Sequence, residues 1–190
     1  MKKIALIAMT AAAAIATPAM AQTVTGTINI TGNVAPKCFV LNGEDVNSTF
    51  TANVAMGELA KSDGTLKDSA TLASTFATQG GSALDVRVLC TSANPAVSVK
   101  AEPLANTTAA PAGYDNSVDY TADVTFTRVG GTTLVSDAST DGTATTATLA
   151  SRLTGTGTNV SVRTSNWSAT GVLVSGDYTG KITVLVSPTA

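Results

Sequence analysis

Histidine is absent from this sequence of 190 residues, and charged residues (13%) and aromatic residues (4%) are scarce. Without histidine the chain lacks the most common general base, the serine–histidine–aspartate triad and the most common transition-metal ligand. The net charge of the whole chain is −2, and beyond Lys2 and Lys3 the basic residues are scattered singly, so nucleic acid binding has no electrostatic basis. These absences predict a protein that is not an enzyme, needs no cofactor and binds no nucleic acid.

The carboxylates of the chain give only a weak indication of a metal-binding or catalytic site. Asp115, Asp119 and Asp123 recur at every fourth position, so they would share the outer face of one strand, where calcium binding or glycoside hydrolysis is conceivable. Nothing in the sequence forces these groups together or buries them, so solvated carboxylates on a wet face are the favoured interpretation.

The aromatic residues give an equally weak signal. The single tryptophan, Trp167, is able to stack on a sugar, but packing inside the protein is the favoured role. We expect Tyr114 and Tyr120 to cap or fill the core.

The N-terminus has the features of a secretory signal peptide. Lys2 and Lys3 precede an apolar run over residues 4–15, and the small residues Ala19 and Ala21 come just before the polar Gln22. The run is too short to remain as a membrane-spanning helix. We therefore expect residues 1–21 to be removed after export, leaving one domain's worth of chain with no later transmembrane segment.

The only two cysteines are Cys38 and Cys90. Two cysteines in a chain bound for an oxidising compartment are the number that forms one bridge. A redox-active pair would more often have two residues between its cysteines, and that spacing is absent. We predict a structural disulfide.

Three segments alternate between apolar and polar residues with the period of a half-buried strand. They lie at residues 84–90, 118–126 and 178–186, and the last has an inward row of Tyr178, Gly180, Ile182, Val184 and Val186. Shorter valine-containing segments at 97–99 and 160–162 suggest further strands, and Gly130 with Gly131 indicates a tight hairpin turn. After the signal peptide no helical period of useful length is visible, except for a turn near residues 57–61. The pattern predicts an all-β, two-layer antiparallel sandwich with an immunoglobulin-like outline.

Residues 22–34, with the sequence QTVTGTINITGNV, also alternate. One face carries Val24, Gly26, Ile28 and Ile30, and the other is rich in threonine. Periodicity alone leaves two interpretations open: this segment is an ordinary first strand of the chain's own sandwich, or it is an arm that pairs elsewhere.

The combination of these features resembles the subunits of chaperone-usher pili, in the spore coat protein U-like and Csu-like branch or the type 1-like branch. The matching elements are the exported chain, the alternating arm ending in GNVAPKC, the second cysteine closing LDVRVLC, and the terminal GDYTGKITVLVSP. The resemblance implies an immunoglobulin-like sandwich that lacks its final strand, so that a groove exposes the core. A periplasmic chaperone would fill that groove first, and at an outer-membrane usher the N-terminal extension of a neighbouring subunit would replace it.

Carried onto this chain, the resemblance implies a donor-strand arm at 22–34 and a pilin domain at 35–190. The donor side chains would be Val24, Gly26, Ile28 and Ile30. The edge of the acceptor groove would be formed by Tyr178, Ile182, Val184 and Val186.

The implied function is that of a structural pilus subunit, which polymerises by donor-strand exchange into a surface fibre for adhesion or biofilm formation. The alternative is a self-complete exported β-sandwich that binds a carbohydrate or a protein.

Because the two cysteines lie further apart than in type 1-like subunits, we expect an insertion at residues 57–81 to be looped out.

Overall fold

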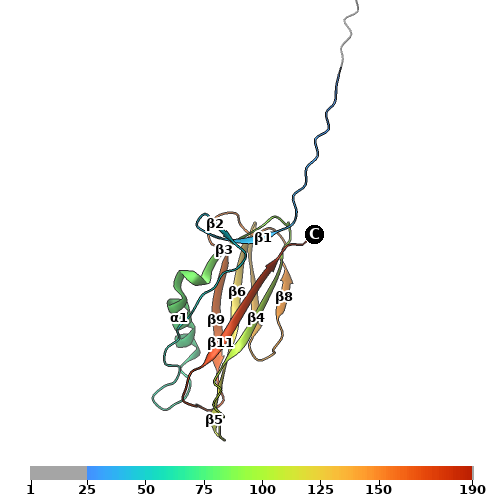
Figure 1. Ribbon diagram of the computed structural model, residues 1–190. Coiled ribbons are helices and arrows are strands. Elements are labelled where there is room, and N and C mark those ends of the chain that lie inside the picture. The colour runs from blue at the N-terminus through green and yellow to red at the C-terminus, as the bar shows by residue number, and fades with distance from the viewer. Residues whose placement is uncertain (1–24, 190) are drawn as a thin grey trace, which may run out of the picture. The chain divides into compact units, whose positions relative to one another are not determined.

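The computed structural model describes residues 25–189, and the chain divides into two units between Asn33 and Val34 (Figure 1). The predicted signal peptide and the predicted donor residue Val24 lie outside the described residues. Residues 25–33 form neither strand nor helix. The unit that begins at Val34, called the body below, is an all-β antiparallel sandwich.

One layer of the body contains six strands. Their order across the sheet is β2, β1, β3, β9, β6 and β7, and every neighbouring pair is antiparallel. The strands are β1 (Cys38–Asn42), β2 (Asp45–Asn47), β3 (Asp85–Cys90), β6 (Ser117–Arg128), β7 (Gly131–Ala138) and β9 (Val160–Ser168). They include the predicted strands at 84–90, 118–126 and 160–162, which are therefore confirmed.

The second layer is narrower, with the strand order β11, β4, β8. These strands are β4 (Ala96–Ala105), β8 (Thr145–Thr148) and β11 (Thr179–Ser187). The pairing of Leu104 with Val118 joins β4 to the start of β6, so hydrogen bonding continues from one layer into the other. A short parallel pair, β5 (Tyr114–Asp115) with β10 (Val172–Leu173), lies apart from both layers.

The core lies between the layers and follows from the period-two alternation. Val118, Ala122, Val124 and Phe126 on β6 are fully buried, while the residues between them are only half-buried. In a pleated strand alternate side chains point to opposite faces, so this pattern requires one face to pack on the core. The same rule places Val97 and Val99 of β4 opposite them.

The expectation that no helix follows the signal peptide is wrong. Helix α1 (Ser69–Gly80) is followed by a 3₁₀ turn, η1 (Gly81–Leu84). Leu72 and Phe76 lie one turn apart on the helix and are buried, and the backbone N–H of Trp167 on β9 donates a 2.9 Å hydrogen bond to Oγ of Ser69. The apolar stripe of α1 is too short to stand out in the sequence.

No helix within residues 25–189 has the length and apolar character needed to cross a membrane.

The predicted disulfide and the predicted hairpin are both confirmed. Cys38 on β1 and Cys90 on β3 are bonded and directly opposite each other in the antiparallel register. Val129 and Gly130 connect β6 to β7. Gly130 and Gly131, the first residue of β7, have φ angles of 88° and 145°, a backbone conformation that residues with a Cβ rarely adopt.

Candidate functional site

The last strand, β11, forms an open edge of its layer. It pairs with β4 from Thr179 to Ser187, and no other strand in the described chain pairs with its second edge. An antiparallel strand directs the N–H and C=O groups of alternate residues to opposite sides. Half of the backbone polar groups of β11 therefore face a side without a ladder partner, and such an edge is a template for another strand.

A second unpaired segment lies across from β11, at residues 50–56. Phe50, Ala52, Val54 and Met56 are half-buried against the core, whereas the three residues between them are exposed. This is the alternation of a strand, yet within residues 25–189 the segment takes part in no strand ladder. Sequence reasoning missed it, although the alternation of Phe, Ala, Val and Met was visible.

Between these two flanks lies a groove with a volume of about 1090 Å³. Three of the four predicted acceptor residues, Tyr178, Ile182 and Val184, line it. The fourth, Val186, packs half-buried against the core but is not part of the lining. The floor is lined by side chains of the core: Phe76, Leu84, Leu104, Tyr120, Val162 and Trp167.

A stacked aromatic pair occupies part of this floor. The rings of Tyr120 and Trp167 have centroids 4.8 Å apart, and both side chains are buried. The predicted packing role of Trp167 and the predicted core position of Tyr120 are confirmed. The prediction for Tyr114 is wrong, because its side chain is 51% exposed; it lies on β5, outside both layers of the sandwich.

The hydroxyl of Tyr120 connects three strands. It lies 2.9 Å from the carbonyl oxygen of Glu102 on β4 and 3.2 Å from that of Lys181 on β11. Burial raises the pKa of Tyr120 above its ordinary value, so the hydroxyl keeps its proton and donates it to these carbonyls. The side chain thereby holds the start of β11 against the rest of the body.

A bulge in β4 lies opposite β11 beside this contact, because three steps along β4, from Ala105 to Glu102, pair with two steps along β11. The register of β11 against β4 changes between Thr179 and Lys181, and Gly180 is the residue between them. A Cβ at Gly180 would come within 2.9 Å of the carbonyl oxygen of Pro103 and 3.0 Å of that of Glu102. Only glycine fits here without moving the backbone of β4.

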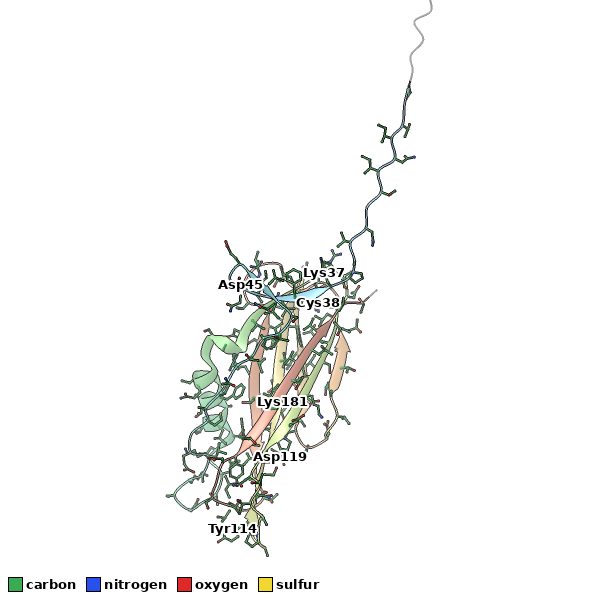
Figure 2. All side chains as sticks on the ribbon, in the orientation of Figure 1. Lys37, Cys38, Asp45, Tyr114, Asp119 and Lys181 are labelled. Carbon is green, nitrogen blue, oxygen red and sulfur yellow. A yellow bond between two sulfur atoms is a disulfide. The ribbon has the colours of Figure 1, made fainter. Side chains whose placement is uncertain are left out.

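The two ends of the body fix the direction of β11. Near its start, the Tyr178 hydroxyl lies 3.1 Å from the carbonyl oxygen of Asp115 in β5. Beyond its end, the carbonyl oxygen of Thr189 accepts a 2.9 Å hydrogen bond from Ser92, next to Thr91, whose hydroxyl accepts one of the same length from Lys37 N–H. Figure 2 shows Lys37 at one end of the body and Tyr114 at the other. Strand β11 therefore runs toward the end at which the chain enters the body.

The predicted donor residues that the structure describes are Gly26, Ile28 and Ile30. None of them lies in a strand, and the side chains of Ile28 and Ile30 are 87% and 92% exposed. Residues 25–33 are uncharged.

The three aspartates considered as ligands do not share a strand face as expected. Asp115 lies on β5, where it accepts hydrogen bonds from Thr170 and Ser117, whereas Asp119 and Asp123 lie on β6. Within residues 25–189 no three histidine, cysteine or carboxylate residues are grouped so that they could hold a metal ion.

Comparison of the chain with models of protein families, with curated proteins and with solved structures found no match.

Proposed function

We propose that this chain is a structural pilus subunit that polymerises by donor-strand exchange, with the arm of one subunit (residues 22–34) occupying the groove of another. The observation that carries the proposal is the groove itself, which is open between two strand-like flanks that both lack a ladder partner on that side. The subunit would be exported through the periplasm and assembled into a surface fibre that serves adhesion or biofilm formation.

The chemistry of the arm is complementary to the groove. A strand laid beside β11 would direct the face with Ile28 and Ile30 to the apolar floor and the threonine face to solvent. Gly26 has no side chain and would need only a shallow part of the groove. Backbone groups of the arm would complete the ladder along β11.

The direction of the chain favours a second copy as the source of the strand. Because β11 runs toward the end where the chain enters the body, an arm folded back into its own groove would have to run parallel to β11. An arm from another molecule is free to enter antiparallel, which is the more stable pairing. The groove therefore suits an intermolecular strand better than the subunit's own arm.

The expected energy explains why such a subunit would need a chaperone. Each apolar donor side chain buried in the groove contributes roughly 1.5 to 3 kcal/mol, and each ladder hydrogen bond roughly 1 kcal/mol, before the cost of ordering the arm. The sum is comparable with the stability of a whole domain. A subunit with an empty groove is then prone to aggregate, so we expect a periplasmic chaperone to cover it until an outer-membrane usher presents the next subunit.

Matched substitutions in the arm test this proposal. In the chain from Gln22 onward, Ile28→Asp places a charge on the face that enters the groove, whereas Thr27→Asp places it on the solvent face. We expect the first variant to remain monomeric and the second to form fibres, as judged by electron microscopy and size-exclusion chromatography. Equal behaviour of the two variants would contradict the proposal.

A second measurement separates the pilus subunit from a self-complete domain. A synthetic peptide of residues 22–33 is added to protein from which those residues have been deleted, and the melting temperature is recorded. For a pilus subunit we expect a rise of several degrees. A self-complete, ligand-binding sandwich would show no rise in melting temperature. If the protein also forms no fibres, it should be screened for carbohydrate binding.

A further inference from the structure

We propose that Met56 is an oxidation site that controls whether the groove accepts a strand, an inference that rests on the proposed function. Met56 belongs to the unpaired flank at residues 50–56, lines the groove and is half-buried. It is also the only methionine of the described residues, since Met1, Met9 and Met20 all precede the predicted cleavage after Ala21.

The surroundings of Met56 make its oxidation state matter. Its neighbours on the same face of the flank are Val54 and Ala52, which pack with it against the core. While the groove is empty, the thioether can be reached by a small oxidant. Once a strand lies in the groove, the same sulfur is covered by that strand, so filling the groove and oxidising Met56 exclude each other.

The chemistry needs only a hydroperoxide. The thioether sulfur attacks the distal oxygen, the O–O bond breaks, and one oxygen atom stays on sulfur as a sulfoxide while hydrogen peroxide leaves as water. The sulfur is oxidised by two electrons and the peroxide is reduced by two, so no further reactant is required. The product replaces a flexible apolar group with a polar one.

A sulfoxide in this position would oppose strand binding. Its oxygen accepts hydrogen bonds, and Ala52 and Val54, which lie beside Met56 on the same face of the flank, carry no side-chain donor for it. A strand that closed the groove would bury that oxygen unpaired, which we expect to weaken binding by at least about tenfold. Empty subunits that meet an oxidant would thus be excluded from assembly, and subunits already in a fibre would be protected.

The test uses the Ile28→Asp variant of the chain from Gln22 onward, which the proposed function expects to be monomeric with an empty groove. A fluorescent peptide of residues 22–33 with the unaltered sequence and dilute hydrogen peroxide are then added. Mass spectrometry follows the addition of one oxygen to Met56, and fluorescence anisotropy measures peptide binding before and after treatment. We expect the oxidised protein to bind at least about tenfold more weakly. Peptide bound beforehand should slow the oxidation several-fold.

The Met56→Leu variant is the matched control, because it keeps an apolar side chain of similar volume and lacks the sulfur. It should bind the peptide equally well with and without peroxide. Melting curves of oxidised and reduced wild-type protein show whether weaker binding reflects the groove or loss of the fold.

The possible results separate this inference from the function on which it rests. Equal affinities of oxidised and reduced protein would overturn the role of Met56 and leave donor-strand exchange intact. A reduced protein that does not bind the peptide, and whose oxidation the peptide does not slow, would overturn both.

Discussion

Strands β6 and β11 have the same alternating sequence pattern but different surroundings. Strand β6 has a neighbour on each edge, and its inward residues from Val118 to Phe126 are buried. Strand β11 has one neighbour among the described strands, and its inward residues Ile182, Val184 and Val186 are only half-buried. The comparison teaches that alternation determines which side chains face the core, whereas the number of neighbouring strands determines how completely they are covered.

The difference also locates the site. The inward face of β11 is as apolar as that of β6. On β11, however, these apolar side chains face the groove and not a neighbouring layer of the core. A further strand beside β11 would cover them, which is what the proposed function requires. Four predictions test this view, from the largest expected effect to the smallest.

The largest effect comes from making the same substitution in both strands. Val124→Ala on β6 removes two methyl groups from a fully buried site, so we expect the free energy of unfolding to fall by about 2 to 3 kcal/mol. Val184→Ala on β11 changes a half-buried site and should cost less than about 1 kcal/mol in the subunit alone. Urea denaturation of each variant measures both values.

The bound peptide should then reverse part of this contrast. With residues 22–33 in the groove, Val184 becomes covered, so we expect Val184→Ala to weaken peptide binding while Val124→Ala leaves it unchanged. If the two variants lose the same stability in the absence of peptide, β11 is already covered and the comparison fails.

The second prediction concerns Gly180 of β11, which lies opposite the bulge in β4. Gly180→Ala would press a Cβ against two backbone carbonyl oxygens of β4, and we expect a loss of about 1 to 2 kcal/mol. Gly155→Ala is the control, because no atom lies within 4 Å of the Cβ that it would add. Thermal melts of the two variants should differ by several degrees, and an unchanged melting temperature for Gly180→Ala would show that β4 yields easily.

Much of the fold could be predicted from the sequence because its signals are local. Period-two alternation located β3, β6 and β11, the glycine pair located the β6–β7 hairpin, and the count of cysteines gave the disulfide. Each of these depends on residues that are close in the chain or on an element that occurs only once.

The features that sequence reasoning missed depend on distant parts of the chain. Helix α1 buries few apolar residues and is held by its contact with β9, which no local pattern reveals. Residues 50–56 alternate, but they count as a groove flank only because they lie opposite β11. The stacking of Tyr120 on Trp167 likewise joins β6 and β9, and the sequence of neither strand predicts that the two pair.

The third prediction concerns the hydroxyl that connects β6 to β11. Tyr120→Phe removes its contacts with the carbonyls of Glu102 and Lys181, and we expect a loss of about 1 kcal/mol at neutral pH. Burial raises the pKa of Tyr120 in the folded protein, so above about pH 10 the unfolded chain loses this proton while the folded chain keeps it. Stability should therefore fall as pH rises above about 10.

Urea denaturation between neutral pH and pH 11 checks this dependence. In Tyr120→Phe the alkaline decrease should be smaller than in the wild type. Some decrease should remain, because partial burial also raises the pKa of Tyr178. An equal decrease in both proteins would mean that Tyr120 does not cause it.

The smallest effect is expected on the outer face of β11. Leu185 points away from the core and is 57% exposed, so Leu185→Thr should change the free energy of unfolding by less than about 0.5 kcal/mol. Peptide affinity should also stay the same, because a strand in the groove contacts the opposite face and the backbone edge of β11, neither of which this substitution alters. Denaturation and anisotropy measure the two quantities. A clear loss of peptide binding would place the incoming strand on the outer face of β11, and the contrast with β6 would then have another cause than an open groove.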